Sequence, residues 1–366
     1  MMRASLLVPT FLDGDAIGND VLGMHAALSK AGVQVKVFAN EWAERLNSIA
    51  HPLSDFPQWA ATQDCLAIYH HAISWEQGWE VFRRGHGTKI VKYHNITPPH
   101  FFAPYSAHYE TLTRLGHQMT ASMVGSPEID LFLADSQFSV NELLTLGLSE
   151  TKGAALPPFH NLSAFDQVEA SLPVLEQFLD GTINLVFVGR VAPNKGHRHL
   201  LHVVKAYRDL FGRRLRLLIV GDPDPPRLQS YQDALQQTVS CLGLNGAVRF
   251  EGKVSIEALK AYYLVGHVLL VMSEHEGFCV PLLEAAHHRL PVLAYASTAV
   301  PETLGPKGLL LDRLDYELFA AAIDTLYTEH AYAEWLADQQ SRHLRSNFDG
   351  PVIEARFWEL LAPFLH

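Results

Sequence analysis

The chain has 366 residues, of which 48% are hydrophobic and 18% are charged, and its formal net charge at pH 7 is −11. This length exceeds what one typical core supports and favours two domains, and the composition is that of a globular protein. The acidic balance argues against nucleic-acid binding, which needs a basic face.

The cysteines and the apolar runs bear on the compartment. Cys65, Cys241 and Cys279 are odd in number and far apart, which implies no disulfide framework and favours a reducing compartment. The apolar run at residues 5–9 is too short for a signal peptide, and no run approaches the length of a transmembrane helix. We therefore expect a cytoplasmic protein whose membrane contact, if any, is peripheral and at the inner face of the cell membrane.

The first half of the chain alternates strands and helices. It opens with a strand at residues 5–9, a loop at 13–20, a helix at about 19–31 and a strand at 33–38, as in a doubly wound domain. The loop lacks the GxGxxG dinucleotide fingerprint. Further elements follow in the same alternation: strands at 65–69, 89–93, 131–134 and 153–156, and helices such as 105–120 and 137–145. This order predicts a parallel sheet covered on both faces.

A second alternating unit follows a stretch with several prolines. Residues 157–182 resemble an interdomain connection, and we place the linker itself at 166–182. The predicted strands after it are 183–188, 215–220, 248–250, 268–272, 291–294 and 308–311. We therefore expect an α/β protein with domains at 1–165 and 183–345, and a helical terminal segment at 346–366.

The most informative stretch is residues 272–304, where seven residues separate Glu276 from Glu284. The apolar run before it predicts a buried strand, and residues 282–289 predict a helix with a proline in its first turn. Glu276 would lie on the loop and Glu284 on the helix, whose open end suits an anion. One carboxylate would then accept hydrogen bonds from sugar hydroxyls and the other from a ribose. The alternative is that both are solvated charges.

Two cations precede this motif. Arg190 and Lys195 lie five residues apart on a loop after a predicted strand, where open α/β sheets bind their ligands. Arginine can bind two phosphate oxygens at once, and lysine supplies a point charge. A pair of solvated loop cations is the alternative.

These motifs together resemble those of the retaining glycosyltransferases of the GT-B fold, family 4 (glycosyl transferases group 1). The family signature EGFGxPxxEA stands here as EGFCVPLLEA at residues 276–285, and the resemblance continues in FVGR at 187–190, PNKG at 193–196 and VPET at 300–303. It implies two Rossmann-like doubly wound domains facing each other across a cleft. The first would be the acceptor side and the second would bind the nucleotide-sugar, with the C-terminal helix crossing back to the first domain.

The resemblance also implies roles for individual residues. Glu276 would hold sugar hydroxyls, Glu284 the ribose, and Arg190 and Lys195 the donor diphosphate, whose growing negative charge must be stabilised. Further residues that we expect to bind substrate are Gly18, Val254, Gly277, Phe278, Cys279 and Val280. Gly18 is the best match to the Gly-rich loop of the family, and an ordinary turn that needs glycine is the alternative.

A histidine is expected to face the sugar from the first domain. His94 is the candidate, because it follows a predicted strand and precedes a Pro turn, and His70 and His71 are the alternatives. Whether His94 acts through its side chain or its backbone is left open, as is a purely structural role.

The resemblance implies no cofactor and no metal. The nucleotide-diphospho-sugar is the donor substrate, and a clear Asp-x-Asp is missing, since Asp222 and Asp224 fit a turn better. Two cations and a helix end can replace a divalent ion. His197, His199 and His202 do not share one helix face, which argues against zinc there. Cys279 could be imagined as a nucleophile activated by a helix start, but a small residue allowing close backbone approach is the preferred interpretation.

The expected function is therefore that of a retaining hexosyltransferase. It would move a hexose from a GDP- or UDP-sugar to a glycan or lipid-linked acceptor, and the leaving phosphate oxygen would take the acceptor proton. A phosphorylase or an epimerase is the alternative among enzymes. A catalytically silent nucleotide-sugar-binding scaffold, or a partner subunit of a transferase, is the alternative of another class. The sequence leaves the oligomeric state open.

One surface patch bears on membrane contact. Basic and aromatic residues gather there in sequence: Arg83, Arg84, Lys89 and Lys92, with Trp75, Trp79, Phe101 and Phe102. A local patch on an acidic body would give at most weak, salt-sensitive binding to anionic lipid. The alternative is that these aromatic residues belong to the core.

Overall fold

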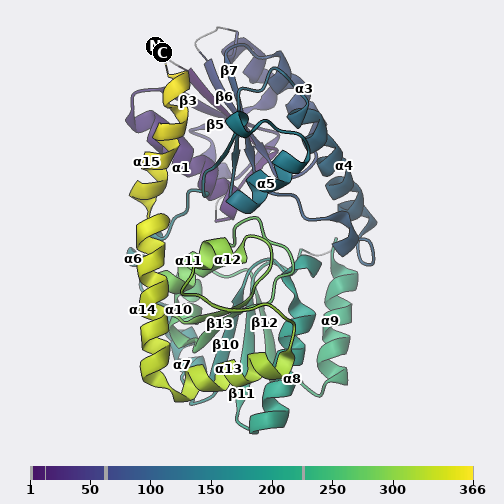
Figure 1. The fold of residues 1–366 in the computed structure, drawn as a ribbon, viewed down its shortest axis with the longest axis vertical. Helices are drawn as coiled ribbons and strands as arrows, with labels where there is room; N and C mark the ends of the chain where they lie inside the picture. Colours follow the sequence, from purple (N-terminus) through teal and green to yellow (C-terminus); the bar gives the residue numbers. More distant parts are fainter. Residues whose placement is uncertain (1–2, 13, 62–64, 225–226, 366) are drawn as a thin grey trace. The chain divides into compact units, whose positions relative to one another are not determined.

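The computed structural model describes residues 3–12, 14–61, 65–224 and 227–365, which form two compact units (Figure 1). The first unit comprises Met1–Pro98, Thr111–His160 and Phe348–His366, and the second comprises Pro99–Glu110 and Asn161–Asn347. Residues 166–182, which we expected to be a linker, group with the second unit and contain the helix α7 (Leu172–Phe178).

The first unit is built on a seven-stranded parallel sheet. In sheet order its strands are β5 (Ala50–Pro52), β3 (Gln34–Ala39), β1 (Arg3–Leu7), β6 (Cys65–His71), β7 (Thr88–Tyr93), β8 (Leu131–Ala134) and β9 (Gly153–Ala155). Its helices are α1 (Ala16–Lys30), α2 (Phe56–Trp59), α3 (Glu76–Arg84), α4 (Ala107–Val124), α5 (Gln137–Thr145) and α15 (Gly350–Leu361). A short parallel pair, β2 (Thr10–Phe11) and β4 (Glu41–Trp42), stands apart from the main sheet.

Side chains from both faces of this sheet are buried, as the alternation of side chains along a strand requires. Leu6 belongs to one core cluster and Leu7 to the other. The first cluster also takes in Phe357 of the terminal helix α15, which lies beside α1 in Figure 1. The second takes in Phe82 of α3. Helices therefore cover both faces.

The second unit repeats this plan with a six-stranded parallel sheet. In sheet order its strands are β12 (Val248–Gly252), β11 (Leu215–Val220), β10 (Ile183–Val188), β13 (Val268–Val271), β14 (Val292–Tyr295) and β15 (Leu309–Leu311). Its helices, besides α7 and the start of α4, are α6 (Ser163–Asp166), α8 (His197–Phe211), α9 (Gln229–Cys241), α10 (Ile256–Val265), α11 (Val280–His287), α12 (Val300–Leu304), α13 (Tyr316–Thr328) and α14 (His330–Asn347). Short 3-10 turns connect several elements in both units.

In both sheets the order in which successive strands are added reverses once, at a topological switch point. In the second unit the first strand, β10, lies between β11 and β13, which gives the order 3-2-1-4-5-6 of a Rossmann domain. In the first unit β1 lies between β3 and β6 in the same way. Ligands of such sheets bind beyond the carboxyl ends of the strands at this point.

The expected fold class, two Rossmann-like α/β units, is confirmed. Long apolar strands were the clearest signal, since β10 is buried along almost its whole length. A glycine in the left-handed conformation ends α8, at Gly212 (φ 63°). The sequence did not reveal β5, β2 or β4, because strands of two or three residues carry no periodic pattern.

Candidate functional site

The loops after β10 and β13 meet at the switch point of the second unit. Asn194, after β10, donates a hydrogen bond from its side-chain Nδ2 to the backbone carbonyl oxygen of His275 (3.0 Å). The backbone carbonyl oxygen of Asn194 accepts from the N–H of Glu274 (2.8 Å). The two halves of the sequence motif, 81 residues apart, are thereby tied into one site.

Gly196 makes this close approach possible. Its φ is 68°, and a Cβ atom there would lie 1.9 Å from the carbonyl oxygen of Met272. Any other residue would push the loop away from the end of β13. The glycine of the PNKG stretch is therefore required by backbone packing.

Lys195 and Glu276, both predicted site residues, form an ion pair. The Lys195 ammonium donates to both carboxylate oxygens of Glu276, at 2.8 and 2.7 Å. Glu276 is only 6% exposed, whereas the Lys195 side chain is 24% exposed. The hydroxyl of Ser273 also donates to Glu276 Oε1 (2.7 Å), and the Glu276 N–H donates to Thr298 Oγ1 (2.8 Å). The carboxylate is thus fixed in direction, and its cationic partner is open to a ligand.

Arg190 is exposed and stacks on an aromatic ring from a distant part of the sequence. Its guanidinium carbon lies 5.3 Å from the centre of the Tyr109 ring, a cation–π arrangement. The Tyr109 hydroxyl donates to the carboxylate of Asp224, and burial, followed by this hydrogen bond, raises the pKa of Tyr109. Sequence reasoning missed Tyr109, because nothing in the pattern of residues 99–110 shows that they pack with the second unit.

Asp222 and Asp224 form a turn, as the sequence suggested. The N–H of Asp224 donates to Asp222 Oδ1 (2.8 Å), and the φ of Asp224 is 52°. The Asp224 carboxylate accepts the hydrogen bond from Tyr109 and thereby helps to fix residues 99–110 within the second unit.

Glu284 lies on α11 and has a tyrosine partner. Its Oε2 accepts a hydrogen bond from the Tyr263 hydroxyl (2.5 Å). Burial raises the pKa of Glu284, and this hydrogen bond opposes the rise. Burial also raises the pKa of Tyr263 well above 10, so the phenol is the donor.

The turn before α11 presents the helix start. Gly277 and Phe278 lead into Cys279, whose φ of 81° places it in the left-handed region, and Val280 is the first helical residue. The N-cap residue Cys279 makes no side-chain cap hydrogen bond. The Leu282 N–H donates to the Cys279 carbonyl oxygen (3.1 Å) and Pro281 has no N–H, so only part of the first turn can offer N–H groups to a ligand. The Phe278 carbonyl oxygen accepts from Thr303 Oγ1 (2.6 Å), which fixes the turn.

The surroundings of Cys279 disfavour an activated thiol and so favour the interpretation as a small residue over that as a nucleophile. Burial, and next the negative charge of Glu276, raises its pKa well above 9. Both effects outweigh the helix start. The residue stands where the family signature has glycine, and the positive φ gives the physical reason for that glycine.

Two further predicted residues lie at loop positions. Val254 is half-buried just beyond β12. Gly18 lies in the first turn of α1, where a Cβ atom would come within 1.6 Å of the Leu12 carbonyl oxygen, and its N–H donates to Asp15 Oδ1 (2.5 Å). Local backbone packing therefore accounts for the glycine at this position.

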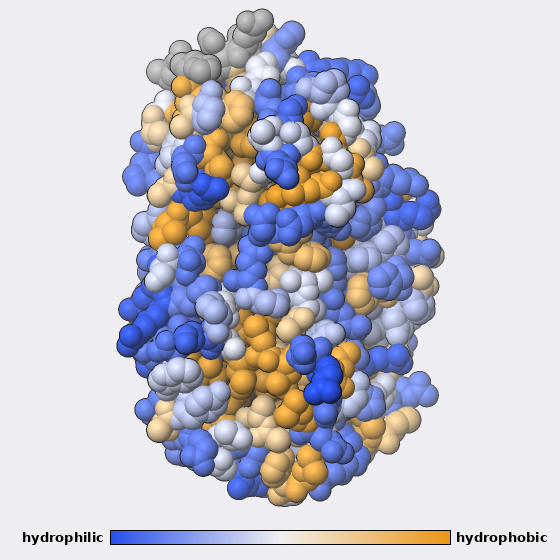
Figure 2. Space-filling model, viewed as in Figure 1, coloured by the Kyte–Doolittle hydropathy of each residue, from blue (hydrophilic) through white to orange (hydrophobic). Residues whose placement is uncertain are grey.

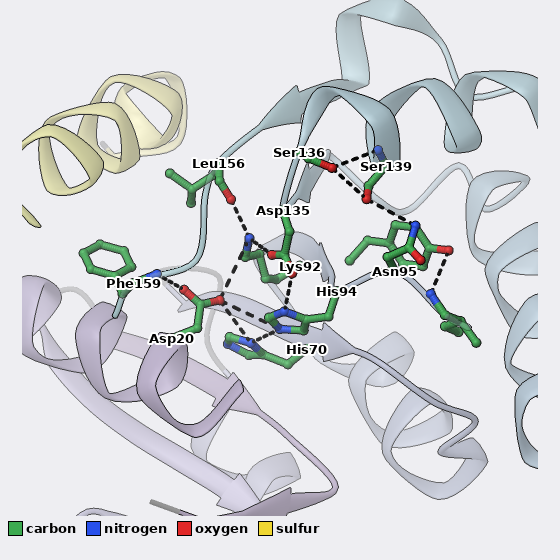
Figure 3. A network of polar contacts seen from close by, with 12 residues as sticks. Asp20, His70, Lys92, His94, Asn95, Asp135, Ser136, Ser139, Leu156 and Phe159 are labelled. Carbon is green, nitrogen blue, oxygen red and sulfur yellow. Dashed lines mark hydrogen bonds and ion pairs between the residues drawn. The ribbon is translucent and has the colours of Figure 1, made fainter. Parts of the chain in front are cut away.

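His94 belongs to a buried cluster at the carboxyl ends of β6, β7 and β8 in the first unit (Figure 3). Its Nδ1 lies 3.1 Å from Asp135 Oδ2, and its Nε2 lies 2.9 Å from His70 Nδ1. The side chain is 4% exposed. Because protein atoms engage both ring nitrogens, the structure favours a backbone or positioning role for His94 over contact through its ring.

Lys92 supplies the central positive charge of this cluster and is fully buried. Its ammonium donates to Asp135 and to the Leu156 carbonyl oxygen (2.6 Å), and it lies 3.9 Å from Asp20 Oδ2. For Asp135, burial raises the pKa, but Lys92 and His94 outweigh it and bring the pKa to about 2. For Asp20, burial dominates and raises the pKa. A lysine within an apolar strand was a signal that sequence reasoning did not use.

Two other histidines that the sequence singled out contact hydroxyl groups of the protein. His71 is buried, its Nε2 lies 2.8 Å from Thr120 Oγ1, and burial lowers its pKa to about 3. His199 contacts the Tyr316 hydroxyl (2.9 Å). Among the described residues, the one group of histidine and acidic side chains close enough to share a metal ion is Asp20, His70 and His94.

The structure does not form the basic and aromatic surface patch that the sequence predicted. Trp75, Trp79 and Phe102 are buried in the core, and so is Lys92. Arg83 pairs with Glu128 at 3.2 Å. The core interpretation therefore holds for these three aromatic residues, whereas Phe101 is half-buried. The face shown in Figure 2 mixes hydrophilic and hydrophobic residues over both units. Within the described ranges, no helix is both long and apolar enough to cross a membrane.

Comparison with known proteins bears on the second unit. Residues 182–329 match the model of the family described as glycosyl transferases group 1. This segment is therefore similar to group 1 glycosyl transferases, and the two Rossmann-like units have the GT-B fold.

Relatives with assigned names match over less than half of the chain. The chain is 31% identical to O-antigen chain mannosyltransferase B of Escherichia coli over 45% of its own length and 44% of the relative's. It is 33% identical to D-inositol 3-phosphate glycosyltransferase of Frankia alni over 43% and 40%. The matched segment thus spans less than half the length of these relatives.

Solved structures match over nearly the whole chain. Sucrose-phosphate synthase from Thermosynechococcus elongatus superposes with a TM-score of 0.79 at 18% identity, covering 99% of both chains. Anabaena HepE, solved in complex with UDP and glucose, gives a TM-score of 0.75 at 16% identity, covering 99% of this chain and 100% of that one. At these identities the likeness shows the fold.

Proposed function

We propose that this protein is a retaining hexosyltransferase that moves a hexose from a nucleoside-diphospho-sugar, with UDP or GDP as the nucleotide, to a saccharide or lipid-linked acceptor. The observation that carries the proposal is the Lys195–Glu276 pair beside the uncapped start of α11. A partly exposed ammonium beside a helix start suits a diphosphate, and a fixed carboxylate suits sugar hydroxyls. The names of the relatives, which include mannosyltransferases, support the same class.

The chemistry follows from the charges. As the sugar leaves, negative charge grows on the diphosphate, and preorganised donors stabilise it without having to reorganise. Lys195 and Arg190 supply two cations, with Arg190 held over Tyr109. Glu276 orients the sugar, and Glu284, fixed by Tyr263, accepts from the ribose. The departing phosphate oxygen takes the acceptor proton on the same face, so no protein base is needed.

A ligand panel followed by a transfer assay tests the proposal. Thermal shifts with UDP, GDP and their hexose conjugates identify the donor, since a ligand at a hundred times its Kd adds about 2.7 kcal/mol of stability. The product's anomeric configuration then reports retention. Donor binding without turnover on any saccharide or lipid-linked acceptor would support the catalytically silent scaffold instead.

The two glutamates are separated by calorimetry with free nucleoside diphosphate. Glu284→Ala should weaken this binding, since hydrogen bonds to a charged acceptor contribute about 1.5–3 kcal/mol. Glu276→Ala should chiefly lower turnover, because the free diphosphate carries no sugar. Tyr263→Phe is the matched control for lost orientation of Glu284. Equal losses of binding in the two alanine variants would show that these roles are assigned wrongly.

We also propose that donor binding needs no divalent cation, because two cations and a helix start face the diphosphate. Activity should survive a chelator added to the assay. Loss of activity that magnesium or manganese restores would redirect attention to Asp222 and Asp224.

Membrane contact, where the acceptor is lipid-linked, should be peripheral and weak. Co-sedimentation with anionic vesicles should give slight binding at low salt and none at high salt, since exposed basic residues contribute about 1 kcal/mol each. Tight binding that resists salt would instead indicate an inserted apolar surface.

A further inference from the structure

The buried cluster of the first unit contains three side chains of the kinds that bind transition metals. Asp20 comes from α1, His70 from the end of β6, and His94 from the residue after β7. All three side chains are almost fully inaccessible to solvent. Two imidazoles and one carboxylate form a recurring three-ligand set for zinc and non-haem iron.

The three facing atoms have the spacing that a single ion requires. His70 Nδ1 and His94 Nε2 are 2.9 Å apart, and each lies 3.8 Å from Asp20 Oδ2. A circle through these atoms has its centre about 2.1 Å from each of them, which is the bond length of Zn²⁺ to nitrogen or carboxylate oxygen, about 2.0–2.2 Å. Figure 3 shows the three side chains converging on this point.

His70 Nδ1 and His94 Nε2 contact each other, so an ion bound between them would replace that hydrogen bond, whereas the outer partners occupy other atoms. His94 Nδ1 lies 3.1 Å from Asp135 Oδ2, an arrangement in which the carboxylate orients a metal-binding imidazole. Asp20 Oδ1 accepts from the Phe159 N–H (2.8 Å). Asp20 Oδ2 has no hydrogen-bond partner among the residues that the structure describes, although it is buried. A buried carboxylate oxygen without a donor is costly, and a cation would satisfy it.

Charge counting favours a cation at the same place. With neutral imidazoles, the cluster holds the carboxylates of Asp20 and Asp135 against the single ammonium of Lys92, and all three are buried. The ammonium is already engaged by Asp135 and Leu156. The net charge of these three side chains is −1 when both carboxylates are ionised, and an uncompensated buried charge is strongly destabilising. A divalent ion would change this net charge to +1, so the count supports a cation beside Asp20 without fixing its valence.

We propose that Asp20, His70 and His94 bind a divalent transition-metal ion of the zinc class, with Asp135 orienting His94 from the second shell of contacts. The ion would link α1 to the ends of β6 and β7 and so fix the carboxyl edge of the first sheet. It is structural and separate from donor binding, so the proposal does not depend on the transferase activity.

Metal content measured directly tests the proposal. The protein is produced without a histidine tag in zinc-supplemented medium, freed of loose metal by gel filtration, and analysed by mass spectrometry of the elements. About one ion per chain is expected, and cobalt-reconstituted protein should show the visible d–d bands of nitrogen and oxygen ligation.

Variants locate the ion. Asp20→Asn and His94→Gln should lose it, and Asp135→Asn should keep a site weakened about 10–100-fold. The matched control is His71→Gln, which removes a buried histidine next to His70 whose ring pairs with Thr120; it should retain the ion.

Two results would overturn the proposal. One is wild-type protein that holds no stoichiometric metal after growth and reconstitution with zinc, which would mean that a proton supplies the missing charge. The other is an unchanged metal content in the Asp20→Asn, His94→Gln double variant. If the variants fail to fold, the wild-type metal content alone decides.

Discussion

The two units place similar charged groups in opposite surroundings. In the first, Lys92 and its carboxylate partners are buried and surrounded by protein atoms. In the second, the Lys195 side chain is 24% exposed, and Arg190 is exposed. Burial strengthens charge interactions and makes the loss of a partner costly, whereas a partly exposed cation can exchange its partner for a ligand. We therefore expect the first cluster to serve the architecture and, under the proposed function, the second to serve binding.

The largest effect should come from removing the buried ammonium. Lys92→Met leaves Asp135 and Asp20 without their cation and should lower the free energy of unfolding by about 3–5 kcal/mol in urea denaturation. Lys30→Met is the control in the same unit, because its ion pair with Glu354 is exposed and contributes at most about 1 kcal/mol. Similar losses in both variants would erase the distinction between the units.

Removing the half-exposed ammonium should act on turnover instead. Lys195→Ala should lower kcat about 10²–10³-fold, the usual cost of losing one charge-stabilising donor. Its stability should fall by only about 1 kcal/mol, because Ser273 still donates to Glu276. Lys205→Ala, which breaks an exposed pair with Asp209, should change neither quantity. A stability loss as large as that of Lys92→Met with kcat intact would contradict the binding role.

Burial should also make the stability of the second unit depend on pH through His197. Burial lowers the pKa of His197 from 6.5 to about 3. Its contribution to stability is therefore complete above pH 6.5 and is lost as the pH falls towards 3, because the unfolded chain takes up the proton first.

The slope from one such group approaches about 1.4 kcal/mol per pH unit. His197→Gln should flatten the fall of the free energy of unfolding between pH 6.5 and 4. The control His199→Gln alters a partly exposed histidine on the same helix and should leave the fall unchanged. An equal flattening in both variants would show that His197 is not the group responsible.

The smallest effect concerns the turn before α11. Cys279→Gly should raise the free energy of unfolding by about 1 kcal/mol or less, since a non-glycine residue at positive φ costs about 1–3 kcal/mol and the lost thiol burial offsets part of this gain. Cys279→Ala keeps the backbone strain and should lower the stability. In the folded protein a thiol reagent should label the exposed Cys241 before Cys279. If glycine and alanine were equally destabilising, packing of the thiol would dominate over strain.

Much of the site could be predicted from sequence, but only as separate pieces. The motif residues Lys195, Glu276 and Glu284 lie within runs of proline, glycine and apolar residues that mark strand ends and helix starts. The structure brings Lys195 and Glu276 into direct contact. The buried cluster was missed because Asp20 and Lys92 show no motif, and single polar residues within apolar elements have no periodic signal.

The order of the longer strands and helices and the Rossmann-like class of both units followed from the sequence alone, because apolar period, proline and glycine act locally along the chain. The group 1 motif followed from its resemblance to that family. Only the tertiary structure decided which charges pair. Lys92 meets Asp135 across 43 residues, and Tyr109 meets Asp224 across 115. It also disfavours an activated thiol at Cys279, because a pKa depends on burial and on neighbouring charges. These contacts are set by sheet order and packing, which no local pattern encodes.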